Sequence, residues 1–380
     1  MMKTNKEKLG IYIHIPFCVR KCNYCGFLSF KSTAEMRRQY VDTLITKIHK
    51  WSKRVGDNYI VDTVFIGGGT PSLLNEKEIK DILDSLKTAF SFDDNPEITI
   101  ESNPNSLTES KLKCYLENGI NRLSIGVQSM DNKVLKTLGR MHTAKEAITA
   151  FKLARTVGFK NINIDLMFAI SGQTSEIFKD TLEQVIHLNP DHISFYSLQI
   201  EEGTQFYEDY KKEKYEFIDD DKMNEMYLMA SNILKENNYE KYEISNAAKN
   251  GKYCRHNLKY WSMAPFLGIG LGASGYFEGQ RYQEPDQYEK WQQEDFPKGF
   301  IEPLEDQMST YVITAMRRAE GINQGEFYKL FGKQLKDVYG HLIPYLNEQA
   351  KKGNLIFKDG VLKFTDQGML VSNDILCEFV

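Results

Sequence analysis

Short runs of apolar and β-branched residues recur along the first half of the chain and alternate with longer segments of helical periodicity. The strand-like runs are residues 10–15, 63–67, 97–101, 122–126, 161–165 and 192–197. The segments between them place apolar residues three or four positions apart, at 34–54, 76–90, 107–118, 144–157 and 175–188. Repetition of strand, crossover helix and strand predicts a parallel sheet with right-handed connections, so the expected fold class is α/β.

The unusual residue clusters fall just after these strands. PFCVRKCNYCGF follows the first strand, GGGTPS the second, NPNS the third and VQSM the fourth. Barrel enzymes assemble their sites from the loops at the carboxyl ends of many consecutive strands, whereas an open sheet uses mainly one crevice. The pattern therefore favours a full or partial barrel, occupying residues 1–240.

The alternation of strands and helices stops after residue 240. Residues 241–281 are rich in Gly, Tyr and Asn with little periodicity, and residues 241–303 are predicted to form a long structured connection. From residue 304 the pattern becomes helical, at 306–319 and 324–331, and Asp359 with Gly360 predicts the turn of a β-hairpin. With a last helix at 365–379, residues 304–380 are expected to form a small, mainly helical domain of winged-helix type.

The composition excludes several classes of protein. The 380 residues are 41% hydrophobic, which is enough to build a folded core. The 48 basic and 52 acidic residues leave no extended basic surface, so nucleic-acid binding is not expected. No stretch reaches the roughly 18 apolar residues of a membrane span, and the start of the chain lacks the apolar core of a secretion signal. We therefore expect a cytoplasmic protein.

Three of the six cysteines, Cys18, Cys22 and Cys25, form a C-x3-C-x2-C motif after the first strand. A tetrahedral zinc site would need a fourth Cys or His nearby, and none follows within the next twenty residues. An iron–sulfur cube accepts three cysteines and leaves one iron open to an exchangeable ligand. The motif favours such a cluster, with structural cysteines or an incomplete zinc site as the alternatives. Cys114 and Cys377 lie in helical patterns and are expected to be buried small side chains.

The run YIHIPFCVRKCNYCGF, together with GGGTPS, resembles the radical S-adenosylmethionine superfamily. Within it, the resemblance is to the branch that contains the oxygen-independent coproporphyrinogen III oxidases and the HemW-type haem chaperones. It implies a partial (β/α)6 barrel in which Cys18, Cys22 and Cys25 bind a [4Fe–4S] cluster. S-adenosylmethionine chelates the fourth iron in that family, and its reductive cleavage gives methionine and a 5′-deoxyadenosyl radical.

The resemblance also assigns contacts to S-adenosylmethionine. Gly68, Gly69 and Thr70 match positions that meet its methionine portion. The other matching positions are Tyr12, Tyr24, Glu101, Gln128, Arg140 and Asp165. Asp165 would hold ribose hydroxyls and Arg140 a carboxylate. Without the resemblance, polar residues at strand ends are typical of helix caps. Whether Gln128 and Arg140 serve one cofactor molecule, a second one or a tetrapyrrole propionate stays open.

A further cluster of polar and aromatic residues lies in the sequence CRHNLKYW, residues 254–261. A His beside an Asn in such a segment is typical of a hydrogen-bonded turn. The alternative is an axial imidazole with flat aromatic walls for a macrocycle. The HN-x-x-YW pattern resembles one found in HemW-type chaperones, so His256, Asn257, Tyr260 and Trp261 are candidate haem-binding residues.

Two features separate the chain from the oxidases it resembles. Those enzymes carry another cysteine where this sequence has Phe27, and they have a long extension before the first strand, where only eleven residues precede Tyr12 here. Both features favour a haem chaperone that binds haem as cargo and delivers it to an acceptor protein. A membrane-associated acceptor, an electron donor and a homodimer are compatible with this reading. The alternatives are oxidative decarboxylation of coproporphyrinogen III to protoporphyrinogen IX, or another radical reaction on a tetrapyrrole, so whether the protein is an enzyme stays open.

Overall fold

A computed structural model describes residues 6–380 and contains a sheet of eleven strands in the order β11-β10-β9-β1-β2-β3-β4-β5-β6-β8-β7. The six predicted strands are its centre and pair in parallel with their neighbours in sequence. Their bounds are β1 Glu7–Ile15, β2 Tyr59–Gly68, β3 Phe92–Ser102, β4 Arg122–Gln128, β5 Ile162–Phe168 and β6 His192–Ser197. The predicted partial (β/α)6 barrel is therefore confirmed.

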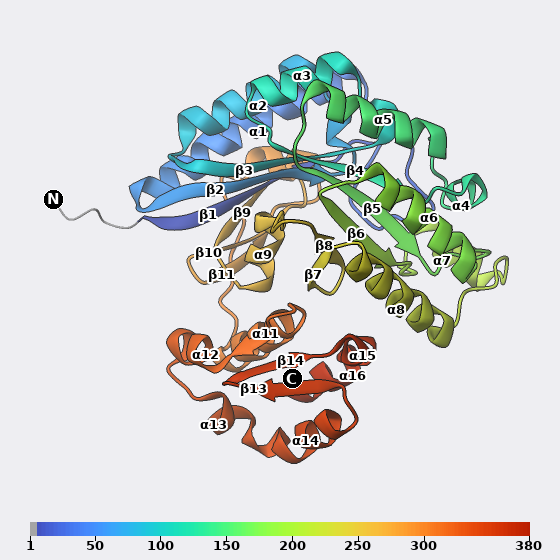
Figure 1. The fold of residues 1–380 in the computed structure, drawn as a ribbon. Coiled ribbons are helices and arrows are strands. Elements are labelled where there is room, and N and C mark those ends of the chain that lie inside the picture. The colour runs from blue at the N-terminus through green and yellow to red at the C-terminus, as the bar shows by residue number, and fades with distance from the viewer. Residues whose placement is uncertain (1–5) are drawn as a thin grey trace.

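The predicted crossover helices are also present and cover the outer face of the sheet (Figure 1). They are α1 Ala34–Val55, α2 Glu76–Ala89, α3 Glu109–Glu117, α5 Ala144–Val157 and α6 Ser175–Leu188, with the short α4 Asn132–Thr137 before α5. Capping boxes begin α2, at Asn75 and Glu78, and α5, at Thr143 and Glu146. Such caps satisfy backbone donors that the first turn of a helix leaves free.

The strands divide their side chains between two environments with a period of two. In β1, Leu9, Ile11 and Ile13 are fully buried in the hydrophobic core, while Tyr12 and His14 alternate with them. The alternate positions of the other strands line the inside of the barrel and are largely polar. Examples are Glu101, Arg122, Ser124, Asn163, Asp165 and Ser194, which surround one internal cavity. The barrel interior is therefore a polar chamber, and the apolar core lies between sheet and helices.

The region after residue 240 differs from the predicted connection, because it extends the sheet at both edges. β7 Glu240–Glu243 and β8 Asn246–Ala248 add to β6, while β9 Phe266–Ile269 pairs in parallel with β1. β10 Ser274–Phe277 and β11 Gln280–Gln283 continue beyond β9. The sheet therefore does not end near residue 240. Strands of three or four residues show too little alternation to be recognised from their sequence.

Four further helices lie between β6 and the C-terminal region. They are α8 Asp220–Glu236, which follows α7 Gln205–Lys211, the short α9 Arg255–Trp261 between β8 and β9, and α10 Tyr288–Gln293 after β11. α10 carries Trp291, which is fully buried and stacks on Tyr40 of α1 with ring centroids 4.9 Å apart. The segment that follows the barrel is thus anchored to the first crossover helix.

The C-terminal region is a small helical unit with a three-stranded sheet. Its elements are α11 Leu304–Met316, β12 Ile322–Asn323, α12 Gln324–Phe331, α13 Leu335–Tyr339, α14 Ile343–Lys351, β13 Leu355–Lys358, β14 Val361–Phe364, α15 Asp366–Leu370 and α16 Ser372–Leu376. Asp359 and Gly360 both have positive φ and join β13 to β14, so the predicted hairpin is confirmed. The single helix predicted at 365–379 is wrong, because Val371 leaves the helical conformation between α15 and α16.

The C-terminal region lies below the barrel in Figure 1 and is joined to the edge strand β7. The backbone N–H of Ile244 donates to the carbonyl oxygen of Arg317 at 2.9 Å, and that of Ala319 donates to Tyr242 at 3.0 Å. Lys241 also forms an ion pair with Asp366.

Within residues 6–380, no helix is long and apolar enough to cross a bilayer.

Candidate functional site

A cavity of about 400 Å³ opens at the carboxyl ends of the parallel strands. It brings together most of the residues singled out in the sequence, although they come from five different strand ends and loops. The predicted residues that line it are Cys18, Cys22, Tyr24, Cys25, Gly68, Gly69, Thr70, Glu101, Gln128, Arg140 and Asp165. Tyr12 lies in an adjoining cavity, described below.

The loop that carries the three cysteines is held on both sides. The backbone N–H of Cys18 donates to Phe30 at 3.0 Å, which closes the loop on itself. At its centre, the N–H of Asn23 donates to Leu138 at 3.0 Å, and its carbonyl oxygen accepts from Phe206 at 2.8 Å. The loop is thereby fixed between the end of α4 and the start of α7.

The three thiols are free, half-buried and directed to the same cavity. Among residues 6–380, no three His, Cys, Asp or Glu side chains are close enough together to hold a single metal ion. Three thiols that face one cavity match the three Cys ligands of an iron–sulfur cluster with one open iron.

The glycine-rich turn after β2 allows its backbone to approach the cysteine loop. Gly68 has φ of +111°, and a Cβ there would lie 2.7 Å from the ring of His14. A Cβ on Gly69 would lie 2.7 Å from the carbonyl oxygen of Phe17 and 3.1 Å from Sγ of Cys18. Thr70 places its hydroxyl 3.5 Å from the same sulfur. Only glycine at these two positions lets the second strand end form a wall of the cavity.

Arg140 links the cysteine loop to the ends of β3 and β4. Its Nη1 lies 3.6 Å from Sγ of Cys22, and its Nη2 donates to Oδ1 of Asn103 at 2.6 Å and to the carbonyl oxygen of Gly126. The positive charge of this guanidinium thus lies beside the cysteine loop. Next to this guanidinium, Gln128 has φ of +70°, a left-handed conformation that costs a non-glycine residue about 1 kcal/mol or more.

Glu101 and Asp165 are two carboxyl groups enclosed by the barrel. Neither forms an ion pair within 4.0 Å in the part of the chain that the structure describes. Oε2 of Glu101 accepts from the N–H of Gly68 at 3.0 Å, and Asp165 accepts from Ser124 at 3.1 Å and Asn163 at 2.7 Å. Burial, and then the charge of Asp165, raises the pKa of Glu101 to about 8. Burial also raises the pKa of Asp165.

A second cavity of about 280 Å³ lies deeper in the barrel and shares Glu101, Asp165 and Tyr196 with the first. Tyr12 lines it, with its hydroxyl 3.0 Å from Nδ1 of His14. Arg122 is 2% exposed and contributes a positive charge at its floor. The interior below the carboxyl groups is thus open, polar and charged.

α9 borders the same interior, and Glu97 of β3 fixes its first turn. The Glu97 carboxylate accepts from the backbone N–H groups of Arg255 and His256, each at 3.1 Å. A carboxylate at this end satisfies free donors and complements the helix dipole, worth about 1 kcal/mol. Asn257 and Tyr260 line the deeper cavity as a result.

His256 does not fit the expectation that it offers an axial nitrogen to a macrocycle. It is 0% exposed, and its Nδ1 lies 2.9 Å from the hydroxyl of Thr63. Its Nε2 lies 2.8 Å from the hydroxyl of Tyr260, and the ring stacks on Phe65. Burial lowers the pKa of His256 to about 3, so the ring is neutral with both nitrogens in use. The hydrogen bond to Tyr260 gives His256 a positioning role.

A third cavity, of about 560 Å³, lies between the barrel and the C-terminal region. Trp261 lines it together with Asn257 and Tyr260, which face both this cavity and the deeper one. Tyr196 lines all three cavities, so they adjoin one another around a single side chain. The three remaining haem candidates, Asn257, Tyr260 and Trp261, thus lie together between the barrel interior and the C-terminal region.

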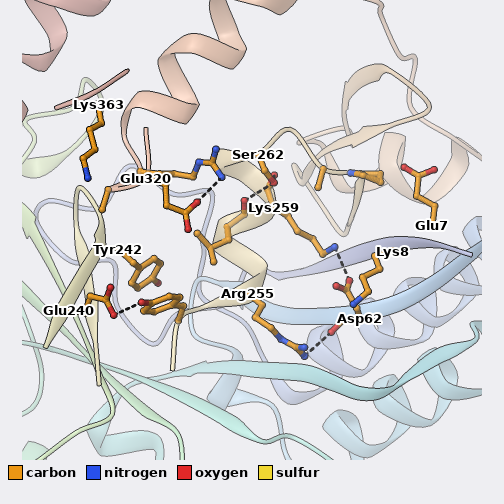
Figure 2. A pocket seen from close by; sticks show the side chains of 16 residues that line it. Glu7, Lys8, Asp62, Glu240, Tyr242, Arg255, Lys259, Ser262, Glu320 and Lys363 are labelled. Carbon is orange, nitrogen blue, oxygen red and sulfur yellow. Dashed lines mark hydrogen bonds and ion pairs between the residues drawn. The ribbon is translucent and has the colours of Figure 1, made fainter. Parts of the chain in front are cut away.

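A larger cavity, of about 690 Å³, lies at the amino ends of the strands, and none of the three motif cysteines lines it. Figure 2 shows its side chains, among them Glu7, Lys8 and Asp62. Four of its charged groups form two ion pairs: Lys259 with Asp62 at 2.8 Å, and Arg318 with Glu320 at 3.5 Å. The hydroxyl of Tyr253 donates to Glu240. The amino-terminal face of a barrel generally contributes stability, and these pairs are consistent with that role.

Some residues of the site were missed by the sequence analysis. Asn103 holds Arg140 and Thr70, and its NPNS motif after the third strand was the available signal. Tyr196 is the inward-facing residue near the end of β6, and the period of two along that strand could have identified it. Cys377 was expected to be buried, but it is exposed.

Comparison with known proteins identifies the family. The Radical SAM superfamily model matches residues 12–185. The heme chaperone HemW of Bacillus subtilis is 32% identical over 97% of this chain and 98% of its own length. HemW of Escherichia coli is 34% identical over 97% of both chains. The chain belongs to the HemW family of radical SAM proteins.

A solved structure supports the fold assignment of this HemW-family chain. Coproporphyrinogen III oxidase (HemN) from Escherichia coli, described as a radical SAM enzyme, superposes with a TM-score of 0.85. The match covers 99% of this chain and 90% of that one at 22% sequence identity. At this identity the likeness shows a shared fold, which includes the C-terminal region.

We expect Cys18→Ala to abolish cluster assembly, because two thiols cannot replace the three that face the cavity. Iron and sulfide per chain and the visible charge-transfer absorption should fall close to background after anaerobic reconstitution. Cys114→Ala is the matched control, since its thiol lies outside the cavity and donates to the carbonyl oxygen of Glu76 at 3.6 Å. Full iron content in Cys18→Ala would remove this residue from the ligand set.

The raised pKa of Glu101 predicts a pH dependence of stability. Between pH 4.5 and about 8 the folded protein keeps a proton that the unfolded chain releases. Stability therefore falls as pH rises through this window, by at most about 1.4 kcal/mol per pH unit for one group. Glu101→Gln cannot ionise, so urea denaturation of the apoprotein should show a shallower loss between pH 5 and 8. The exposed Glu183→Gln should keep the wild-type slope, and an unchanged slope in Glu101→Gln would contradict the prediction.

Proposed function

We propose that this protein is a haem chaperone of the HemW type, which binds haem as cargo and passes it to an acceptor protein. The observation that carries the proposal is its similarity, over 97% of the chain, to proteins named heme chaperone HemW. The match extends through the C-terminal region and the segment that contains α9. The function requires a haem acceptor and an electron donor as partners.

The cavity at the strand ends fits a [4Fe–4S] cluster with S-adenosylmethionine. Cys18, Cys22 and Cys25 supply three soft ligands to one space and leave a position free. Arg140 offsets negative charge on the thiolates, and the close approach of Gly69 to Cys18 leaves backbone at the cavity wall. When bound, the cluster and S-adenosylmethionine together would supply one-electron reductive chemistry.

The remaining residues of the cavity suit the polar parts of the cofactor. Gly68, Gly69 and Thr70 present backbone and hydroxyl groups to its methionine portion. Glu101 and Asp165 form no ion pair with another described residue at 4.0 Å or less, so they have capacity for an ammonium group and for ribose hydroxyls. Tyr24 and Gln128 complete the wall beside Arg140, and Tyr12 lies below them.

The haem candidates lie next to this cavity. They offer aromatic surface, whereas the cavity offers thiols and carboxyl groups. Tyr260 and Trp261 present aromatic surface, and Asn257 presents an amide, at the boundary with the C-terminal region. His256 orients Tyr260 through the hydrogen bond at Nε2. These residues suit the face and edge of a flat macrocycle.

Oxidative decarboxylation of coproporphyrinogen III is the second candidate, because the fold is that of the oxidase. Phe27 is evidence against oxidative decarboxylation. This residue stands where the oxidases carry another cysteine, is 67% exposed and borders both inner cavities. An apolar ring there supplies neither a proton nor a thiol to a reacting group.

The decisive experiment compares the two functions in one preparation. Protein with a reconstituted cluster, S-adenosylmethionine and a strong reductant is incubated anaerobically with coproporphyrinogen III, and the E. coli oxidase serves as positive control. We expect no protoporphyrinogen IX by chromatography, together with saturable haem binding by absorbance titration. Repeated turnover to protoporphyrinogen IX would make the protein a decarboxylase, and a lack of haem binding would refute the carrier proposal.

His256→Gln separates positioning from ligation. Because both ring nitrogens are hydrogen-bonded in the folded protein, we expect the variant to bind haem more weakly by a few-fold while its axial-ligand signature stays that of the wild type. Optical and electron paramagnetic resonance spectra of the ferric haem complex measure the signature. Loss of a histidine-ligand signature in His256→Gln would show that the imidazole leaves Tyr260 and binds the iron.

A further inference from the structure

The third cavity combines walls from the barrel with walls from the C-terminal region. β5, β6, α8 and α9 supply one side, while the end of α11 and the residues of α15 and α16 supply the other. Its aromatic side chains are Phe168, Phe195, Tyr196, Tyr227, Tyr260 and Trp261. With about 560 Å³ of space, it has the size and lining of a small-molecule site.

Arg317 is the single cation among the described residues that line this cavity. It follows α11 and is half-buried, and its Nη2 donates to Oδ1 of Asn373 at 2.9 Å. Within residues 6–380 it forms no ion pair at 4.0 Å or less. Burial lowers the pKa of Arg317, and the charge of Glu243 opposes that shift. A partly desolvated guanidinium without an anionic partner has unused capacity for a carboxylate.

Glu243 is the one acidic side chain of the described lining, and it does not occupy Arg317. It is 1% exposed, and its Oε1 accepts from the N–H of Ser245 at 3.1 Å. Its Oε2 has no hydrogen-bond partner among the described residues. Burial raises the pKa of Glu243 to about 7, so near neutral pH this carboxyl group is partly protonated and opposes a second carboxylate less.

The neighbouring Arg318 differs from Arg317 in its ion pairs. It faces the cavity at the amino ends of the strands, where it pairs with Glu320 at 3.5 Å and Glu326 at 3.8 Å. Two adjacent guanidinium groups thus face different cavities, and among the residues that the structure describes Arg318 has anionic partners whereas Arg317 has none. The unpaired group lies among aromatic side chains, so the ligand it suits is flat and apolar and bears a carboxylate.

We propose that Arg317 binds a propionate carboxylate of a tetrapyrrole whose ring occupies this third cavity. The inference rests on the proposed haem-carrier function and assigns part of the cargo site to the C-terminal region. Aromatic rings from the barrel contact the macrocycle, and Arg317 fixes its orientation through the carboxylate. Asn373 holds the guanidinium in place for that contact.

The test compares haem with its dimethyl ester, which keeps the macrocycle and removes both carboxylate charges. The full chain with its reconstituted cluster is titrated with each compound, as wild type, Arg317→Gln, Arg317→Lys and Arg318→Gln. A charged hydrogen bond contributes about tenfold or more in affinity. We therefore expect the wild type to prefer haem over the ester by about tenfold, Arg317→Gln to lose that preference, and Arg317→Lys to keep part of it.

Arg318→Gln is the matched control and should retain the preference of the wild type, and thermal unfolding reports whether each variant is folded. Equal affinity of the wild type for haem and ester, or a preference that survives in folded Arg317→Gln, would overturn the role of Arg317 while the carrier function stands. A wild type that binds neither compound would overturn the proposed function, and the role of Arg317 with it.

Discussion

The parallel alignment of β1 to β6 is the constraint on which the site depends. Because all six strands run in one direction, their carboxyl ends reach the same edge, and side chains as far apart in sequence as Cys18 and Tyr196 line one cavity. In each of these strands, every second side chain faces the interior of the barrel. The chain fills those positions with polar side chains that bond one another, as Asp165 does with Ser124 and Asn163, instead of closing the interior with apolar ones. The open polar interior is what leaves room for ligands.

α9 is the second organising element, because it connects the barrel interior with the C-terminal cavity. Glu97 fixes its first turn, and the buried pair of Lys259 with Asp62 fixes its far side. Removing one partner of such a buried pair typically costs about 3–5 kcal/mol, since the other charge stays buried. With both ends held, α9 presents Asn257 and Tyr260 to the interior and Trp261 to the outer cavity, and His256 serves the packing between them.

Sequence patterns predicted those features that depend on local signals. The strands, the crossover helices, the hairpin at Asp359 and the clustering of the three cysteines all follow from periodicity or spacing over a few residues. The added strands β7 to β11 could not be predicted, because three or four residues carry too little alternation. The role of His256 was also beyond reach, since its partner Thr63 is 193 positions away and only the fold brings them together. Arg317 gave no signal for the same reason, because its free guanidinium is a property of the packed C-terminal region.

The scaffold by itself does not distinguish a carrier from an oxidase. A TM-score of 0.85 at 22% identity with coproporphyrinogen III oxidase means that very different sequences build the same barrel and C-terminal region. Function on a shared fold is set by the side chains that line its cavities. In this chain those side chains form a cysteine-lined cavity with unpaired carboxyl groups and, beside it, an aromatic cavity with one free cation among its described lining residues. Tyr196 lines both cavities, so a change in the position of this one side chain alters the shape of both.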